Sequence, residues 1–337
     1  MNRSRLENSL LSTWYAHKRP PFGLQLLAHL FRGTSALRRG AYAHGVLPSR
    51  RVSVPVVVVG NITVGGSGKT PLTIWLAQAL AERGIHPGIV TRGYGGNARQ
   101  WPRDVLPTSS AGEVGDEAVL LARAARCPVV AGPDRAAAAA RLLDHTPVDV
   151  ILADDGLQHY ALARDFEIAV IDGERGLGNG WALPAGPLRE PVARLDRVDA
   201  IVIKGGADKI AIPGALSMAL ALCDAQSIAG DERRPLASFR GTPVHAVAGI
   251  GNPEQFFAAL RAAGLDIVPH PLPDHAALTL DDVEFEDERP VLMTEKDAVK
   301  LPAVFGGQLW VVPAEAQLPK AEADDLLTRI AGLVRVS

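Results

Sequence analysis

The chain has 337 residues, enough for two domains with buried cores. Hydrophobic residues make up 47% of it, which excludes a disordered chain and is typical of a globular α/β protein. Two cysteines, Cys127 and Cys223, exclude a disulfide framework and indicate a reducing compartment. The sequence has neither a run of about 18 apolar residues nor a secretory signal peptide, so we expect it to stay in the cytoplasm.

Basic residues are concentrated at the N-terminus. Residues 1–51 contain nine Lys or Arg and one acid, Glu7, whereas the whole chain has a formal net charge of −2. Apolar residues such as Phe22, Leu26 and Leu30 recur at helical spacing within 22–42, which predicts a basic amphipathic helix. Such a helix either lies in a membrane interface or packs on its own domain, and the residues alone leave both open. Nucleic acid is the weakest interpretation, because no nucleic-acid-binding motif is present.

A run of apolar β-branched residues, Val56–Val59, predicts a buried strand, and a Gly-rich turn and a helical pattern follow it. In this context glycines let backbone N–H groups approach phosphate oxygens at a helix N-terminus. Lys69 is expected to reach the β- and γ-phosphates, and the Thr70 hydroxyl is expected to bind Mg²⁺. A turn that binds nothing is the simpler alternative, which the flanking strand and helix disfavour. The predicted nucleotide-binding residues are Thr63, which replaces a usual Gly, Val64, Gly65, Gly66, Ser67, Gly68, Lys69 and Thr70.

Downstream of Arg51, short apolar runs alternate with helical patterns. This alternation predicts a mostly parallel sheet of the P-loop NTPase type with helices on both faces. The expected strands are 54–59, 88–91, 128–131, 149–153, 166–171 and 200–204, and the expected helices are 72–81, 116–126 and 135–143. Residues 97–114 look irregular.

Gly- and Pro-rich segments at 205–208 and 213–214 predict a hinge. The elements beyond the hinge are assigned to a second, smaller α/β domain. They are strands at 215–222, 244–249, 266–269, 291–294 and 309–312 and helices at 253–264 and 320–334. The predicted division is a basic amphipathic segment (1–50), a nucleotide-binding core (51–206) and a smaller domain that closes over the site (207–337).

Asp154 and Asp155 follow the apolar run 150–153, at the carboxyl end of a predicted buried strand. Ligands bind at that edge of an open α/β sheet. Because adjacent side chains on an extended backbone point to opposite sides, one of the two carboxylates is expected to face Mg²⁺. A helix N-cap or an Asx turn is the simpler interpretation, and the GLQH string that follows favours the metal role.

Four further motifs carry groups whose role the residues alone leave open. Asp116 opens a predicted helix, where an acid usually complements the helix dipole but could accept a proton from an acceptor hydroxyl. His275 follows Asp274 in a loop and is either solvated or orients a base. Glu190, in a Pro-rich loop, and Lys296, after a predicted strand, either face the cleft or connect elements.

The motifs of this chain resemble, in their order, those of one enzyme family. They read GNITVGGSGKTP, RGYGG, GDE, ADDGLQH, GNGWALPAGPLREP, GIGNPEQFF, PDH and TEKDAVK. This order is similar to that of the tetraacyldisaccharide 4′-kinases of the lipid A pathway, from about Trp14 to Trp310. No single motif suffices, and the shared order makes the resemblance specific.

The resemblance implies a P-loop transferase with two α/β/α domains. It implies transfer of the ATP γ-phosphoryl group to the 4′-hydroxyl of tetraacyldisaccharide 1-phosphate, a membrane glycolipid, to give lipid IVA. It also implies peripheral attachment to the cytoplasmic face of the bacterial inner membrane through an N-terminal helix. Anionic inner-leaflet lipids are then the expected partners of the basic segment, with neither nucleic acid nor an obligate protein partner.

The resemblance also implies roles for single residues. Asp116 in GDE matches the family's proposed base, and His275 in PDH matches its partner. The family often has a second His after this one, and here Ala276 takes its place. The phosphate-loop pair and the acids at the metal are matched by Lys69, Thr70, Asp154, Asp155 and, less closely, Glu190.

Two other functions remain open on the residues alone. The first is a P-loop ATPase or GTPase of the switch or partitioning type that transfers no phosphoryl group. The lysine that marks the partitioning-type loop is missing here, because Val64 occupies its place. The second is a soluble small-molecule kinase, in which the basic segment would serve for packing or dimerisation.

Overall fold

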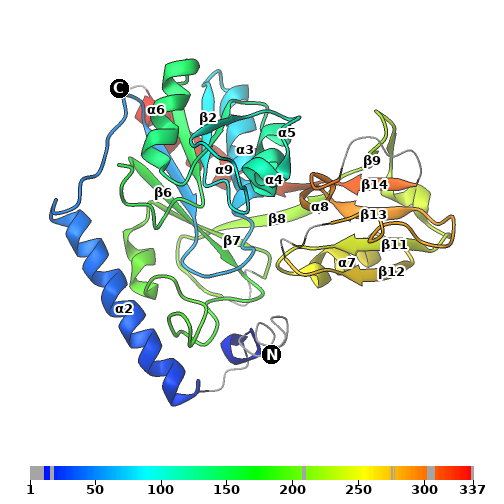
Figure 1. Ribbon diagram of the computed structural model, residues 1–337, viewed down its shortest axis with the longest axis horizontal. Coiled ribbons are helices and arrows are strands. Elements are labelled where there is room, and N and C mark those ends of the chain that lie inside the picture. Colours follow the sequence, from blue (N-terminus) through cyan, green and yellow to red (C-terminus); the bar gives the residue numbers. More distant parts are fainter. Residues whose placement is uncertain are drawn as a thin grey trace.

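Two lobes of unequal size make up the computed structural model, which describes residues 11–15, 19–206, 210–274, 276, 278–301 and 308–334 (Figure 1). The larger one, the core lobe, is built on a nine-stranded sheet, and the smaller one, the second lobe, is built on a six-stranded sheet. A separate helix, α2 (Phe22–Ala43), lies along the outer side of the core lobe, on the left in Figure 1.

The core sheet is parallel except at its two edges. Its strand order is β15-β8-β7-β6-β1-β5-β2-β4-β3, and only β15 and β3 pair antiparallel among these described strands. The central strands are continuous apolar runs because both of their faces are covered. Their bounds are β1 Val56–Gly60, β2 Pro87–Thr91, β3 Arg103–Val105, β4 Val129–Ala131, β5 Val150–Asp154, β6 Phe166–Asp172, β7 Ala200–Lys204, β8 Leu216–Leu222 and β15 Ala314–Gln317.

Helices cover both faces of the core sheet, as the sequence predicts. The side of β1 that carries Val57 and Val59 packs with three helices, and the side that carries Val56 and Val58 packs with one helix and nearby loops. The three helices are α3 (Lys69–Glu82), α5 (Asp116–Ala124) and α9 (Lys320–Val334); the single one is α6 (Arg135–His145), near the 3₁₀ helix η1 (Val192–Arg197).

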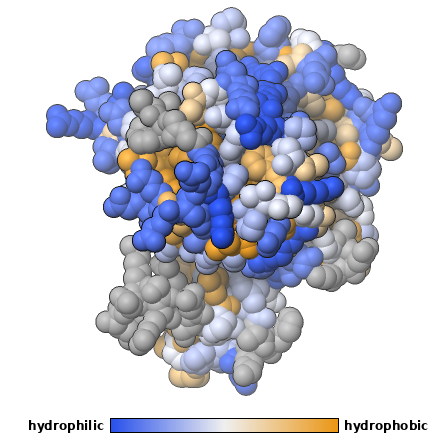
Figure 2. Space-filling model, turned by 90° about the vertical axis from the view of Figure 1, so that its right-hand side faces the viewer, coloured by the Kyte–Doolittle hydropathy of each residue, from blue (hydrophilic) through white to orange (hydrophobic). Residues whose placement is uncertain are grey.

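The second lobe has the strand order β10-β9-β14-β13-β11-β12 around a core that includes Phe257 and Trp310. Hydrophilic side chains are interspersed with apolar ones on the face at this end of the molecule (Figure 2). Its elements are β9 Ala225–Ser227, β10 Arg233–Arg234, η3 Leu236–Phe239, β11 Val244–Ala248, α7 Pro253–Ala262, β12 Ile267–Pro271, β13 Val291–Thr294, α8 Glu295–Ala298 and β14 Leu309–Val312.

A two-stranded antiparallel ribbon connects the lobes. The chain leaves the core along β8 and continues into β9, and it returns along β14 and β15. Leu222 pairs with Ala314 in the core sheet, Ser227 pairs with Trp310 in the second sheet, and the Cys223 N–H donates to the Pro313 carbonyl between them (2.9 Å).

The structure corrects the assignment of three segments beyond residue 206. The predicted strand 215–222 and helix 320–334 are formed, but they belong to the core lobe as β8 and α9. β15, which no pattern predicts, pairs with β8 at the edge of the core sheet. The sequence prediction assumed that elements after the hinge stay together, whereas the chain returns to the core.

Helix α2 contacts the core lobe through small side chains. Ala28 is fully buried and packs with Ala182 and Ala185. Apolar side chains on other sides of the helix remain exposed, among them Leu26 at 62% and Leu30 at 65%. Within the part of the chain that the structure describes, no helix combines the length and apolar character needed to cross a membrane.

Contact between two Gly-rich turns fixes the start of α5. Gly115 has φ of +93°, and a Cβ added there would lie 2.4 Å from the carbonyl oxygen of Tyr94. A Cβ on Gly96 would lie 2.5 Å from the carbonyl oxygen of Glu113. At both glycines the nearest atoms belong to the backbone, so neither position has space for a side chain. The region predicted to be irregular also contains β3 and the short helix α4 (Ala111–Val114).

Gly115→Ala is expected to lower the free energy of unfolding by about 2–3 kcal/mol, because it adds both a clash and a left-handed backbone strain. Urea unfolding followed by circular dichroism measures this change. Gly112→Ala is the matched control, since its nearest contact would be Ser110 Oγ at an ordinary 3.6 Å. Equal stability of the two variants would contradict the proposed backbone contact.

Candidate active site

The phosphate loop, residues 61–68, connects β1 to α3. Asn61 is fully buried, and its Nδ2 donates to Ser67 Oγ (3.1 Å) across the base of the loop. The Val64 N–H donates to the Pro187 carbonyl (2.9 Å), so the loop rests on the Pro-rich segment predicted to face the cleft or connect elements. Gly68, the N-cap of α3, supplies no capping side chain. The first N–H groups of α3 can therefore serve an anion.

The first residues of α3 face the end of β5. Because β1 and β5 pair in parallel, the phosphate loop and the two aspartates lie at the same sheet edge. Thr70 Oγ1 lies 3.4 Å from Asp154 Oδ2, and Thr73, one turn later, donates to Asp154 Oδ1 (3.0 Å). Lys69 Nζ lies 3.5 Å from Asp155 Oδ1. The structure thus brings four of the predicted site residues together.

The two adjacent carboxyl groups differ in their charge because their surroundings differ. Burial, together with the charge of Glu117, raises the pKa of Asp154 to about 7. Burial also acts to raise the pKa of Asp155, but the positive charges of Lys69 and Arg189 outweigh it and lower that pKa to about 2. Asp154 can therefore exchange a proton for a cation near neutral pH, whereas Asp155 is a permanent negative charge.

The oxygen atoms of Thr70 and Asp154 fit the coordination chemistry of Mg²⁺. This hard cation prefers oxygen ligands and is usually held by one or two carboxylates together with substrate phosphates and water. A larger protein cage is absent from the described residues, where no three His, Cys, Asp or Glu side chains form a metal-binding group. The remaining ligands would come from a nucleotide and from water.

Asp116 is the first residue of α5 and is buried, with 7% of its surface exposed. Its Oδ1 accepts the N–H of Glu117 (2.9 Å), and the charge of Glu117 acts on Asp154, so the start of α5 lies near the end of β5. His275, the predicted partner of Asp116, lies outside the described residues. Their pairing therefore stays a prediction.

Glu190 is buried in a network of protein donors. Its Oε1 accepts from Gln158 Nε2 (2.9 Å), and its Oε2 accepts from the Tyr160 hydroxyl (2.7 Å). Arg194 Nε lies 3.5 Å and Arg39 Nη1 lies 3.8 Å from the same Oε2. A metal role for Glu190 stays a prediction. The contacts of its carboxylate with Arg39 of α2 and with donors of the core lobe indicate a structural role, in which Glu190 joins α2 to the core lobe.

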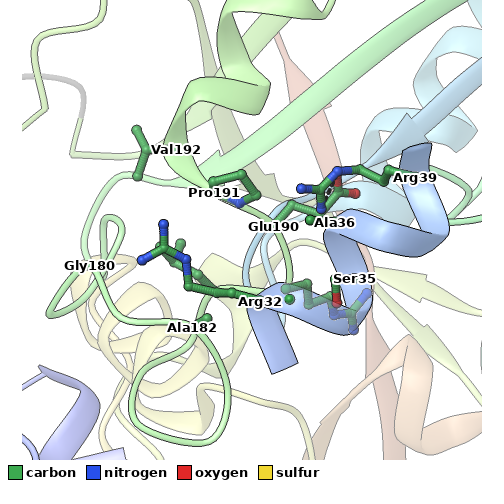
Figure 3. Close-up of a pocket in the computed structure, with 12 residues that line it drawn as sticks. Arg32, Ser35, Ala36, Arg39, Gly180, Ala182, Glu190, Pro191 and Val192 are labelled. Atoms are coloured by element: carbon green, nitrogen blue, oxygen red, sulfur yellow. Dashed lines mark ion pairs between the residues drawn. The ribbon is translucent and has the colours of Figure 1, made fainter. Parts of the chain in front are cut away.

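A cavity of about 440 Å³ opens between α2 and the segment 180–192. Arg32 and Arg39 line it from α2, and Arg189 and Glu190 line it from the core lobe, with Arg39 and Glu190 forming an ion pair (Figure 3). Arg189 also donates to Asp155 Oδ1 (3.1 Å), so the cavity borders the carboxylates at the phosphate loop. Its cationic lining suits an anionic, hydroxyl-bearing ligand.

Arg135 is a cation of this site that no motif marks. It is 3% exposed, its Nη1 donates to the Gly132 carbonyl (3.1 Å), and its Nε has no hydrogen-bond partner among the described residues. Burial lowers its pKa to about 10, although the negative charges of Asp155 and Asp154 act in the opposite direction. An Arg in the first turn of a helix usually faces solvent, so the residue type gives no sign of a site here. The only signal in the sequence is that Arg135 follows the carboxyl end of the strand β4.

Comparison with known proteins identifies the family. Residues 21–331 match the family model described as LpxK, tetraacyldisaccharide-1-P 4′-kinase. The chain belongs to this family. Curated proteins called tetraacyldisaccharide 4′-kinase are similar to it: that of Nitrosococcus oceani is 49% identical over 319 residues (95% of this chain, 93% of the relative), and that of Alkalilimnicola ehrlichii is 49% identical over 326 residues (95% and 94%).

A solved structure of LpxK from Aquifex aeolicus in complex with ATP has the same fold. It superposes with a TM-score of 0.78 and 27% identity, covering 91% of this chain and 97% of that chain. The resemblance of the sequence to the tetraacyldisaccharide 4′-kinases and the predicted P-loop-type α/β fold are therefore confirmed. Members of this kinase family are transferases, and the roles of individual residues in this chain stay predictions.

The raised pKa of Asp154 predicts a pH dependence of stability. Above about pH 4 the unfolded chain loses a proton that the native state keeps until about pH 7, so the free energy of unfolding falls as the pH rises through this window. Asp154→Asn cannot ionise. It should therefore gain about 2 kcal/mol relative to the wild type between pH 5 and pH 8.

Urea unfolding at pH 5 and pH 8, with EDTA and without nucleotide, measures the difference between variant and wild type. Asp282→Asn, in the second lobe, is the control, because hydrogen bonds from Thr279 lower the pKa of Asp282 and place its titration below this window. A difference for Asp154→Asn that is the same at both pH values would contradict the raised pKa.

Proposed function

We propose that this protein transfers the γ-phosphoryl group of ATP to the 4′-hydroxyl of a tetraacyldisaccharide 1-phosphate, which gives lipid IVA in lipid A biosynthesis. The observation that carries the proposal is the placement of Lys69 and Thr70 against Asp154 and Asp155 at the end of β5. This is the arrangement that a triphosphate and its cation need, in a chain whose family is named for this reaction.

In this reaction the acceptor oxygen attacks the γ-phosphorus, the bond to the β–γ bridging oxygen breaks, and ADP leaves. The protein contributes position and charge rather than a covalent intermediate. Lys69 and the N–H groups at the start of α3 offset negative charge on the phosphates. Asp116 accepts the proton of the acceptor hydroxyl, and His275 orients Asp116.

Thr70 and Asp154 are the residues that would hold Mg²⁺, whose charge favours the leaving of ADP when the ion is bound. Asp155 lies between Lys69 (3.5 Å) and Arg189 (3.1 Å) and keeps both cations in place. The negative charge of Asp155 offsets the repulsion between the two cations at the site.

The acceptor is expected in the cavity beneath α2. Arg32 and Arg39 supply charges for its phosphate-bearing headgroup. Its acyl chains cannot leave a bilayer cheaply, since each exposed CH₂ costs about 0.8 kcal/mol. The exposed apolar side chains of α2 allow this helix to lie in the interface, on the cytoplasmic face of the bacterial inner membrane. The basic N-terminal segment then meets anionic lipids.

The direct test supplies [γ-³²P]ATP, Mg²⁺ and the acylated disaccharide 1-phosphate in detergent micelles, and resolves the product by thin-layer chromatography. We expect a labelled glycolipid, and we expect Asp116→Ala to lower kcat by about 100-fold or more while ATP binding is retained. ATP hydrolysis at full rate without the acceptor would instead indicate an ATPase of the switch type. Equal activity on a deacylated disaccharide would indicate a soluble kinase.

The role of α2 is tested by vesicle flotation with anionic phospholipid. Leu26→Gln combined with Leu30→Gln is expected to weaken binding at least tenfold, because two exposed leucine side chains no longer enter the interface. Leu106→Gln, which alters an equally exposed leucine of the core lobe, is the control and should bind as the wild type does. Unchanged flotation of the double variant would move the membrane contact elsewhere.

A further inference from the structure

Lys296 belongs to the TEKDAVK string, and the sequence alone leaves open whether it faces the cleft or connects elements. It lies on α8 of the second lobe, and 16% of its side chain is exposed. Its Nζ is 3.1 Å from Asp274 Oδ1 of the same lobe and 3.3 Å from Glu117 Oε1 on α5 of the core lobe. One ammonium group therefore joins the two lobes beside the candidate base, Asp116.

Three described carboxylates act on this single ammonium group. Burial by itself would lower the pKa of Lys296, but the carboxylates of Glu117, Asp274 and Asp116 raise it above its ordinary value. The ammonium group thus stays charged at neutral pH among carboxylates that come from both lobes. Without it, Glu117 and Asp274 would repel each other across the interface.

The backbone that carries Lys296 is held rigidly by its neighbour, Asp297, which is fully buried. Asp297 Oδ2 accepts from the Thr294 hydroxyl (2.6 Å) and from the Gly249 N–H (2.8 Å), and its Oδ1 accepts from Lys300 Nζ (2.9 Å). The same short helix therefore fixes both Lys296 and the turn 249–252.

That turn contacts the phosphate loop. A Cβ added to Gly251 would lie 3.1 Å from the backbone nitrogen of Gly66, so the two backbones are close together. Arg175 Nη2 of the core lobe donates to the Gly251 carbonyl (2.6 Å). Nearby, Lys204 Nζ donates to Gln255 Oε1 (2.9 Å). The second lobe is thus seated against the loop that binds the triphosphate.

We propose that Lys296 is a positioning residue of the phosphoryl transfer: it neutralises carboxylates from both lobes and thereby holds the second lobe closed over the phosphate loop beside Asp116. This role rests on the proposed kinase function and goes beyond it. Lys296 does not touch the transferred group. It keeps the turn 249–252 at the phosphate loop, and its positive charge favours the ionised form of the base.

The test compares Lys296→Met, Lys296→Arg and wild type in the full-length protein. For Lys296→Met we expect kcat to fall by about 30-fold, because small displacements of catalytic groups are costly, while the Kd for an ATP analogue changes less than threefold. Removing a positive charge raises the pKa of nearby carboxylates, so the acid limb of the kcat/KM profile should move up by about one pH unit. Small-angle X-ray scattering should show a larger radius of gyration.

Lys296→Arg should restore the acid limb and the radius of gyration, since it restores the charge. Lys320→Met removes one exposed lysine of the core lobe and is the matched control for net charge. An unchanged kcat and acid limb in Lys296→Met would overturn the proposal, as would a change that Lys296→Arg fails to restore. If the wild type transfers no phosphoryl group, the proposed function fails, and scattering still tests the closure.

Discussion

The site depends on the parallel pairing of β1 with β5. In this register Val59 lies opposite Asp154, so the end of β1 and the acid that ends β5 reach the same edge of the sheet. The start of α3 then lies over that edge, and two hydroxyl groups, those of Thr70 and Thr73, contact one carboxylate. A slip of one residue would turn Asp154 to the opposite face and remove these contacts.

The adjacent carboxyl groups of Asp154 and Asp155 have different roles at this edge. Burial and the charge of Glu117 disfavour the ionised form of Asp154, and Asp154 is therefore suited to a cation. Asp155, at φ of +48°, leaves the strand direction and meets Lys69 and Arg189. Arg189 also lines the cavity under α2. The ion pair between Arg189 and Asp155 therefore connects the place proposed for the headgroup with the place proposed for the triphosphate.

Most of the elements that the sequence predicts correctly are predicted from patterns of neighbouring residues. The phosphate loop, the strand before it and the helix after it depend on neighbouring residues, and they were predicted in the correct places. The return of β15 and α9 to the core was missed, because it depends on pairing across about ninety residues. Arg135 and Glu190 show the same limit. Their partners lie on other elements, and neither the burial of Arg135 nor the contacts of Glu190 with Tyr160 and Gln158 leaves a mark in the local sequence.

The two-stranded ribbon makes the second lobe an insertion within the core lobe rather than a domain added at its end. Both crossings lie side by side, at Cys223 and Pro313, and a hydrogen bond ties them together. Two crossings joined by a hydrogen bond restrict the directions in which the second lobe could rotate more than a single crossing would. It also follows that the chain cannot be shortened from its C-terminus to yield a free core, since Leu326 and Ile330 of α9 complete the packing over the sheet.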